Sequence, residues 1–135
     1  MATKIMLAAI LLAHAAIHLL FLSPHPATAA GGAPWPFEIG RSWALSPLGA
    51  GSDVLRILGI ALIAVMFAGY VLAGLSMFRL APGGVWAPAI AIGSLASIAL
   101  LGLFYHRYLV LGVGVDVVLL WAVLLAHWRP AGVLR

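Results

Sequence analysis

Cysteine is missing from this 135-residue chain, and charged residues are scarce. Without cysteine the protein cannot form a disulfide, hold an iron–sulfur cluster through thiolates or use a thiolate nucleophile. Only 7% of its residues are charged, whereas soluble domains carry roughly a quarter. These shortages exclude cysteine chemistry and an ordinary soluble domain.

Apolar side chains are what the chain has in abundance. Hydrophobic residues make up 65% of the sequence, and the mean hydropathy is +1.19. So few charges cannot cover so much apolar surface in water, and the expected solvent is therefore lipid. The basic residues, which give a net charge of +4, are scattered singly near the ends of apolar segments. That pattern is typical of membrane anchoring and argues against nucleic-acid binding.

Four apolar stretches are long enough to cross a bilayer, which takes about 20 residues. They are predicted to form transmembrane helices over residues 5–22, 54–78, 85–105 and 109–127. No segment alternates polar and apolar residues as a membrane-spanning strand would. The sequence therefore predicts one all-α domain over 1–135, an integral membrane four-helix bundle.

The connections between these helices differ in length. Two short links, around residues 82–84 and 106–108, predict antiparallel neighbours. The first connection, residues 23–53, is long and interrupted by prolines. Its segment 34–43 mixes aromatic residues with one acid and one base, which favours a position along the membrane surface. This segment could be a surface-anchored loop or a lid over the bundle.

The basic residues also indicate an orientation. With the amino terminus inside, the inner face carries Lys4, Arg79, Arg129 and Arg135, and the outer face carries Arg41, Arg56 and Arg107. Basic residues favour the cytoplasmic side. We therefore expect a multi-pass protein of the cell membrane with both termini in the cytoplasm.

Three ionisable residues lie well inside the apolar segments, away from the segment ends, and an aspartate costs at least about 2.5 kcal/mol at the helix centre. His14 and His18 are four residues apart, on one face of the first helix. Asp116 lies in the fourth helix between two valines. From the helical rise of about 1.5 Å per residue, all three lie at a similar depth in the outer half of the bundle. They are predicted to point inward.

Three interpretations of this group remain open. Asp116 could form a structural ion pair with Arg56 or Arg107, because buried charges are usually paired. His14 and His18 could instead ligate a metal such as copper, zinc or iron, with Asp116 or His106 completing the site. The acid and the imidazoles could also relay protons or bind the polar head of a lipophilic molecule.

Stripes of small residues predict close helix packing. Ala89, Gly93 and Ser97 follow one another at four-residue spacing in the third segment, and Gly69 and Ala73 do so in the second. Such stripes let helices approach closely in lipid. They could serve contacts within the bundle, with a membrane-protein partner or between copies of the chain.

This layout resembles a group of small, uncharacterised bacterial four-helix membrane proteins. The shared features are the His14/His18 pair, a long outer loop, Arg56 at the start of the second helix and Asp116 in the last. The resemblance implies no activity, and no catalytic residue is assigned. With little mass outside the membrane, the chain is interpreted as a small subunit or accessory protein of a larger membrane assembly. The alternative is a protein that binds a metal or a lipophilic ligand, with redox activity as one option, at the His/Asp group.

Overall fold

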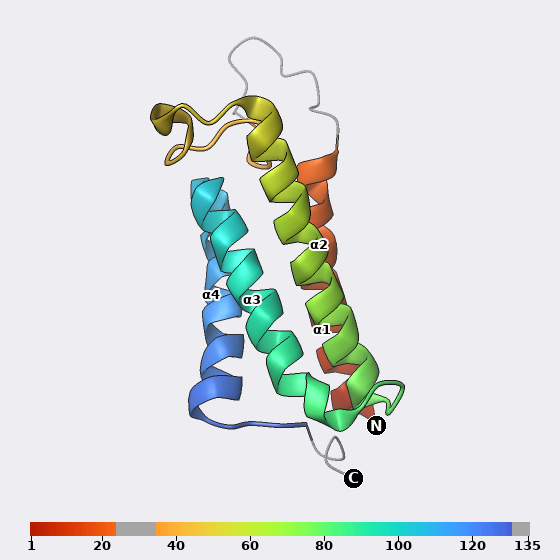
Figure 1. Ribbon diagram of the computed structural model, residues 1–135. Coiled ribbons are helices and arrows are strands. Elements are labelled where there is room, and N and C mark those ends of the chain that lie inside the picture. Colours follow the sequence, from red (N-terminus) through yellow and green to blue (C-terminus); the bar gives the residue numbers. More distant parts are fainter. Residues whose placement is uncertain (24–34, 131–135) are drawn as a thin grey trace.

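Four apolar helices, each long enough to cross a membrane, make up most of the protein. The computed structural model describes residues 1–23 and 35–130, and no strand occurs among them. The helices are α1 (Ala2–His18), α2 (Ser52–Met77), α3 (Trp86–Leu103) and α4 (Val110–Leu120) (Figure 1). The predicted fold class, an all-α membrane bundle with a long first connection, is confirmed.

Short irregular turns extend three of the helices. A 3₁₀ turn, η1 (Leu19–Leu22), continues α1, and η3 (Gly83–Val85) and η4 (Arg107–Leu109) precede α3 and α4. A π-helical turn, η5 (Trp121–Leu125), follows α4. With these turns, the spans run over Ala2–Leu22, Ser52–Met77, Gly83–Leu103 and Arg107–Leu125. They agree with the predicted segments to within three residues at each end.

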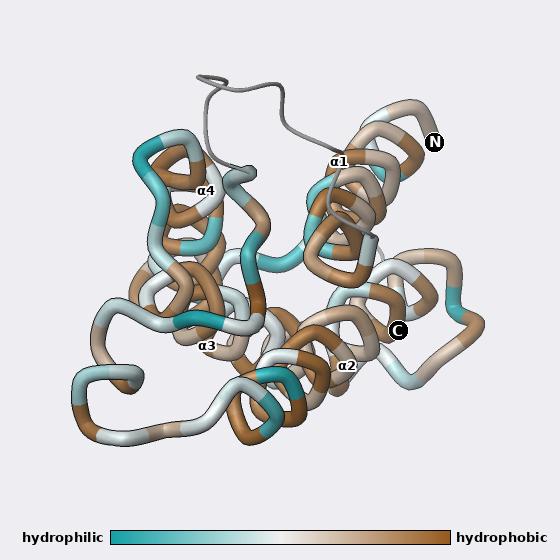
Figure 2. The backbone as a smooth tube through the Cα atoms, turned by 90° about the horizontal axis from the view of Figure 1, so that it is seen from above, coloured by the Kyte–Doolittle hydropathy of each residue, from teal (hydrophilic) through white to brown (hydrophobic). Residues whose placement is uncertain are grey.

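Chain order sets the order of the helices around the bundle. Viewed along the helices, α1, α2, α3 and α4 follow one another, so that α1 and α4 face each other across the remaining side (Figure 2). Successive helices pack together, and the α2–α3 pair packs most extensively. Contacts between α1 and α4 are sparse by comparison. The bundle is therefore least tightly closed between its first and last helices.

The close packing of α2 on α3 depends on small residues. A Cβ added at Gly69 would come within 2.7 Å of the Ala89 carbonyl oxygen and 2.9 Å of the Gly93 Cα. Ala89, Gly93 and Ser97 are all buried, as are Gly69 and Ala73. The stripes thus face other helices of the same chain, as predicted for contacts within the bundle.

The second half of the long connection packs on one end of the bundle. The Ser42 hydroxyl donates to the Leu103 carbonyl at 2.6 Å, and the Trp43 indole donates to the Gly102 carbonyl at 2.6 Å. Ile39 is only 5% exposed and lies against Gly59 of α2. Part of the connection, residues 24–34, lies outside the described residues. From Trp35 onward the segment is held against α2 and α3.

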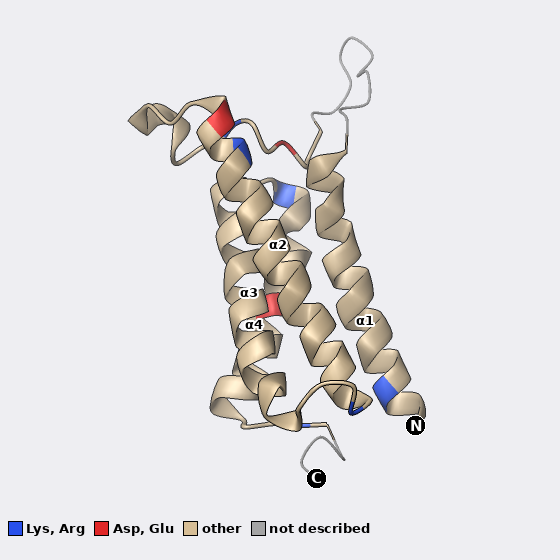
Figure 3. Ribbon diagram, turned by 45° about the vertical axis from the view of Figure 1, so that its right-hand side comes forward, with Lys and Arg blue, Asp and Glu red and all other residues tan. Residues whose placement is uncertain are grey.

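The distribution of charge fits a multi-pass membrane protein. Lysine and arginine occur near the two ends of the bundle, while the helix sides are almost free of charge (Figure 3). Many large apolar side chains are exposed on those sides, among them Ile57, Ile92, Leu111 and Val118. In α4, Asp116 is the one buried residue. The last helix therefore turns most of its surface outward and one carboxylate inward.

Candidate functional site

The two histidines of α1 face the interior of the bundle. His14 is 8% exposed and His18 is 2% exposed, and their rings meet edge to face with centroids 4.9 Å apart. The four-residue spacing places them one turn apart on the same face of the helix. The prediction that both point inward is confirmed.

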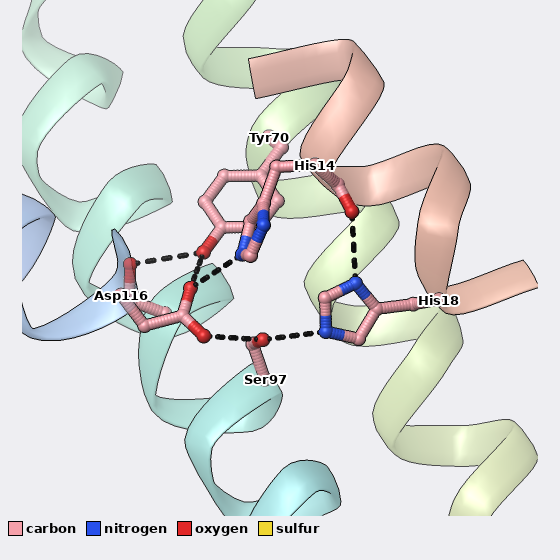
Figure 4. A network of polar contacts seen from close by, with 6 residues as sticks. His14, His18, Tyr70, Ser97 and Asp116 are labelled. Carbon is pink, nitrogen blue, oxygen red and sulfur yellow. Dashed lines mark hydrogen bonds and ion pairs between the residues drawn. The ribbon is translucent and has the colours of Figure 1, made fainter. Parts of the chain in front are cut away.

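The Asp116 carboxylate is the centre of a polar cluster that draws on all four helices (Figure 4). His14 Nε2 lies 2.9 Å from Asp116 Oδ1, and the Tyr70 hydroxyl donates to the same oxygen. The Ser97 hydroxyl donates to Asp116 Oδ2 at 2.5 Å. Asp116 itself is fully buried. Both carboxylate oxygens are thus satisfied without water.

His18 is held by hydrogen bonds at both ring nitrogens. Its Nδ1 lies 2.9 Å from the carbonyl oxygen of His14, and its Nε2 lies 2.9 Å from Ser97 Oγ. A carbonyl oxygen only accepts, so Nδ1 must carry a proton. Nε2 is then the nitrogen that faces Ser97 and, beyond it, Asp116 (Figure 4).

Three members of the cluster were not assigned to the site from the sequence. Tyr70 and Ser94 are fully buried, and the Tyr70 hydroxyl lies 3.1 Å from Ser94 Oγ. Ser97 was read only as a small packing residue, yet its hydroxyl contacts both Asp116 and His18. The position of Tyr70 in the sequence could have indicated its place in the cluster. Tyrosine prefers the membrane interface, so a tyrosine deep in an apolar segment needs an interior partner.

The structure gives Asp116 a different ion-pair partner from the two arginines considered in the sequence. In residues 1–23 and 35–130, the ion pair of this carboxylate is with His14. Arg107 is exposed and donates to the Tyr108 hydroxyl at 3.1 Å, and Arg56 is exposed near the start of α2. His106 lies in the α3–α4 turn, where its Nδ1 accepts from the Tyr108 backbone, and it does not belong to the cluster.

A cavity of about 280 Å³ lies beside the cluster, between α1 and α4. Its wall is mostly apolar and is completed by the two histidine rings. The lining residues are His14, Ile17, His18, Phe37, Leu101, Tyr108, Leu109, Leu111, Gly112 and Val115. None of these is an acid, a lysine or an arginine. The imidazoles are therefore the main polar surface that this cavity offers.

Phe37 connects the long first connection to this cavity. Its ring packs edge to face on Phe21 with a centroid distance of 5.3 Å, and the Trp35 ring lies tilted against it with a centroid distance of 5.4 Å. Phe21 belongs to η1, at the end of the first span that leads into the long connection. The connection thus supplies part of the cavity wall, as expected of a lid.

The cluster offers two kinds of chemistry. The possible ligand atoms of His14, His18 and Asp116 all lie within 4.8 Å of one another, which is compact enough for a metal ion. The imidazoles, hydroxyls and carboxylate can also donate and accept hydrogen bonds at the edge of an apolar cavity. No protein-family model, curated protein or solved structure matches this chain.

Proposed function

We propose that this protein binds a lipophilic molecule with a small, uncharged polar head in the cavity between α1 and α4. The observation that carries the proposal is a mostly apolar cavity within the membrane-spanning region whose polar lining residues are His14, His18 and Tyr108. Ligand sites are typically concave and mostly apolar, with a few polar groups that fix orientation. Because no fixed charge lines the cavity, a charged head would have no direct partner there.

The bundle offers such a molecule a route from the bilayer. The first and last helices are the least closely packed neighbours, and the cavity lies between them. The apolar tail of the ligand could remain in the lipid while its polar head reaches the rings of His14 and His18. Phe37 and Tyr108 would cover the end of the cavity nearest the membrane surface.

The accessory-subunit hypothesis receives less support from the packing. One of its grounds, beside the small mass outside the membrane, is the small-residue stripes, which are available for contacts with a partner helix. Gly69, Ala89 and Gly93 are instead used between α2 and α3 of the same chain. The geometry therefore favours ligand binding over assembly as the principal role.

We place the cavity in the outer half of a bacterial cell membrane, with both termini in the cytoplasm. The support is the count of basic residues in the sequence. Four of them (Lys4, Arg79, Arg129 and Arg135) fall on the side of the termini, against three (Arg41, Arg56 and Arg107) on the other side. Met1, Lys4, Trp128 and Pro130 line a common pocket, so the two ends of the described chain lie together.

Photolabelling in nanodiscs tests the ligand proposal. The probe is a long-chain alcohol that carries a diazirine, and the labelled positions are mapped by mass spectrometry. We expect labels on Ile17, Val115 and other cavity-lining residues. The Gly112→Leu variant should lose this labelling, because its new side chain points at His14 Cε1 (3.7 Å from an added Cβ) and at the end of the Leu101 side chain.

Gly114→Leu is the matched control. Gly114 is on the same helix, two residues away, and an added Cβ there meets nothing within 4 Å. This variant should be labelled like the wild type. Uniform labelling over the lipid-facing surface, unaffected by Gly112→Leu, would refute the proposal.

A further inference from the structure

We infer that His14, His18 and Asp116 bind one divalent transition-metal ion of the zinc or iron(II) class at the edge of the cavity. Two imidazoles and one carboxylate, drawn from α1 and α4, place their ligand atoms within 4.8 Å of one another. Two histidines with one carboxylate form a recurrent ligand set for zinc and for non-haem iron. The set contains no thiolate or thioether, which soft ions such as copper(I) prefer.

Small side-chain movements would convert the present contacts into coordination. Ligand atoms about 2.0–2.2 Å from a tetrahedral zinc ion lie roughly 3.3–3.6 Å from each other. His14 Nε2 and Asp116 Oδ1 are now 2.9 Å apart, so they need to separate by only a few tenths of an ångström. His18 Nε2 must move nearer to the carboxylate, past the Ser97 hydroxyl that now bridges them.

The contacts around the three residues are those that orient metal ligands. His18 Nδ1 donates to the His14 carbonyl oxygen. Because Ser97 gives its one proton to Asp116, His18 Nε2 donates to Ser97 Oγ, and an ion would bind at Nε2 in place of that proton. Tyr70 and Ser97 donate to the carboxylate and fix its plane. Metal-bound histidines commonly donate their second N–H to a carbonyl, and metal-bound carboxylates accept hydrogen bonds in the same way.

Charge supplies a second argument. Asp116 is fully buried in an apolar bundle, and its ion-pair partner in the described residues is His14, which is charged only when protonated. An unpaired carboxylate in such surroundings is costly. A divalent cation would supply the positive charge that no lysine or arginine provides there.

The cavity leaves a coordination position accessible. Three protein ligands occupy three of the four positions of a tetrahedral ion, as in catalytic rather than purely structural sites. His14 and His18 both line the cavity, so the remaining position would face it and could hold water. The metal site does not depend on the lipophilic ligand, because water suffices as the fourth ligand.

Zinc binding to the purified full-length protein tests the inference. The protein in detergent is stripped with a chelator, dialysed against Zn²⁺ and analysed by elemental mass spectrometry. We expect one zinc per chain. Removing a ligand should weaken binding by more than about 100-fold, since even changes to residues that merely support ligands cost 10–100-fold. The variants are His14→Ala, His18→Ala and Asp116→Asn.

Two histidines outside the cluster provide matched controls. His106→Ala and His127→Ala should retain one zinc per chain, because neither residue belongs to the group of three. If these variants lose zinc, or if the wild type retains no more zinc than His14→Ala, the inference is wrong.

X-ray absorption is measured on the zinc-loaded wild type, so this test does not depend on whether any variant folds. We expect two imidazole nitrogens and oxygen ligands at about 2.0–2.2 Å. A zinc coordination shell without imidazole nitrogens would overturn the assignment of His14 and His18 as ligands. The wild type separates the two proposals, since a protein that binds one zinc but is not photolabelled at the cavity would keep the metal inference and lose the lipophile proposal. Photolabelling of a wild type that binds no zinc would leave the lipophile proposal standing alone.

Discussion

A single carboxylate determines the polar chemistry inside this bundle. Asp116 accepts from Tyr70 and Ser97 and pairs with His14, so the groups around it come from the other three helices. Each of these contacts joins residues at least 19 positions apart in the chain. The cluster therefore ties together helices that apolar contacts alone would hold less specifically.

Ser97→Ala should measure how much the carboxylate depends on its hydroxyl donor. The change leaves Asp116 Oδ2 and His18 Nε2 without their described partner, and both residues are buried. We expect the free energy of unfolding, measured by denaturant titration in mixed micelles, to fall by about 1–3 kcal/mol. Ser94→Ala is the control on the same helix. In the described part of the chain the Ser94 hydroxyl hydrogen-bonds Tyr70 and not Asp116, so an equal loss there would contradict the central role of Asp116.

Tyr70→Phe combined with Ser97→Ala tests whether the two hydroxyls act through the same carboxylate. Either single change leaves Asp116 one hydroxyl donor, whereas the double change leaves only His14. The double variant should therefore lose more unfolding free energy than the sum of the single losses. Coupling between residues in one network is typically about 0.5–3 kcal/mol. Additive losses would mean that the hydroxyls act independently.

The sequence predicted part of this cluster for a clear physical reason. The four-residue spacing of His14 and His18, together with the energetic cost of a lipid-facing Asp116, was enough to predict that all three side chains point inward. The contribution of Ser97 was not predicted, because a single serine hydroxyl is tolerated in an apolar helix. The depth of Tyr70 in its segment indicates an interior partner but does not identify Asp116 as that partner. The partner of Asp116 depends on the rotation of each helix, which hydropathy does not determine.

At the scale of the helices, α2 and α3 form the most closely packed pair. Gly69→Ala should separate them, because the added Cβ would meet backbone atoms of Ala89 and Gly93 rather than a movable side chain. Overpacking of this kind typically costs about 1–3 kcal/mol of unfolding free energy. The measurement is the same denaturant titration in mixed micelles.

Gly74→Ala is the control for this change. It lies in the same helix, and an added Cβ meets nothing within 4 Å. Alanine is favoured over glycine within a helix by up to about 1 kcal/mol, so this variant should be unchanged or more stable. A loss equal to that of Gly69→Ala would show that glycine is needed for reasons other than close approach.

The helices themselves could be predicted, but the course of the first connection could not. Each span follows from a predominantly apolar run and ends at the breaks that the sequence predicts. Residues from Trp35 onward are instead placed by distant contacts, such as those of Ser42 and Trp43 with carbonyls at the end of α3. Such contacts join positions about 60 residues apart and leave no local pattern.

For the whole molecule, the short turns predict which successive helices are antiparallel neighbours. They do not predict how closely α1 packs against α4. That last contact closes the bundle, and here it is loose enough to leave a cavity beside the Asp116 cluster. The most informative feature for function therefore arises from α1 and α4, the one pair of neighbouring helices that no connection joins directly.

The absence of cysteine allows the proposed orientation to be tested with single introduced thiols. Leu48 in the first connection is 81% exposed, and Leu80 in the α2–α3 turn is 73% exposed. These positions lie at opposite ends of α2, so they should lie on opposite sides of the membrane. With both termini in the cytoplasm, a membrane-impermeant maleimide should label Leu48→Cys in intact cells and Leu80→Cys only after permeabilisation. The reverse pattern would place the termini outside and the cavity in the inner half, and labelling of both in intact cells would contradict a membrane-spanning α2.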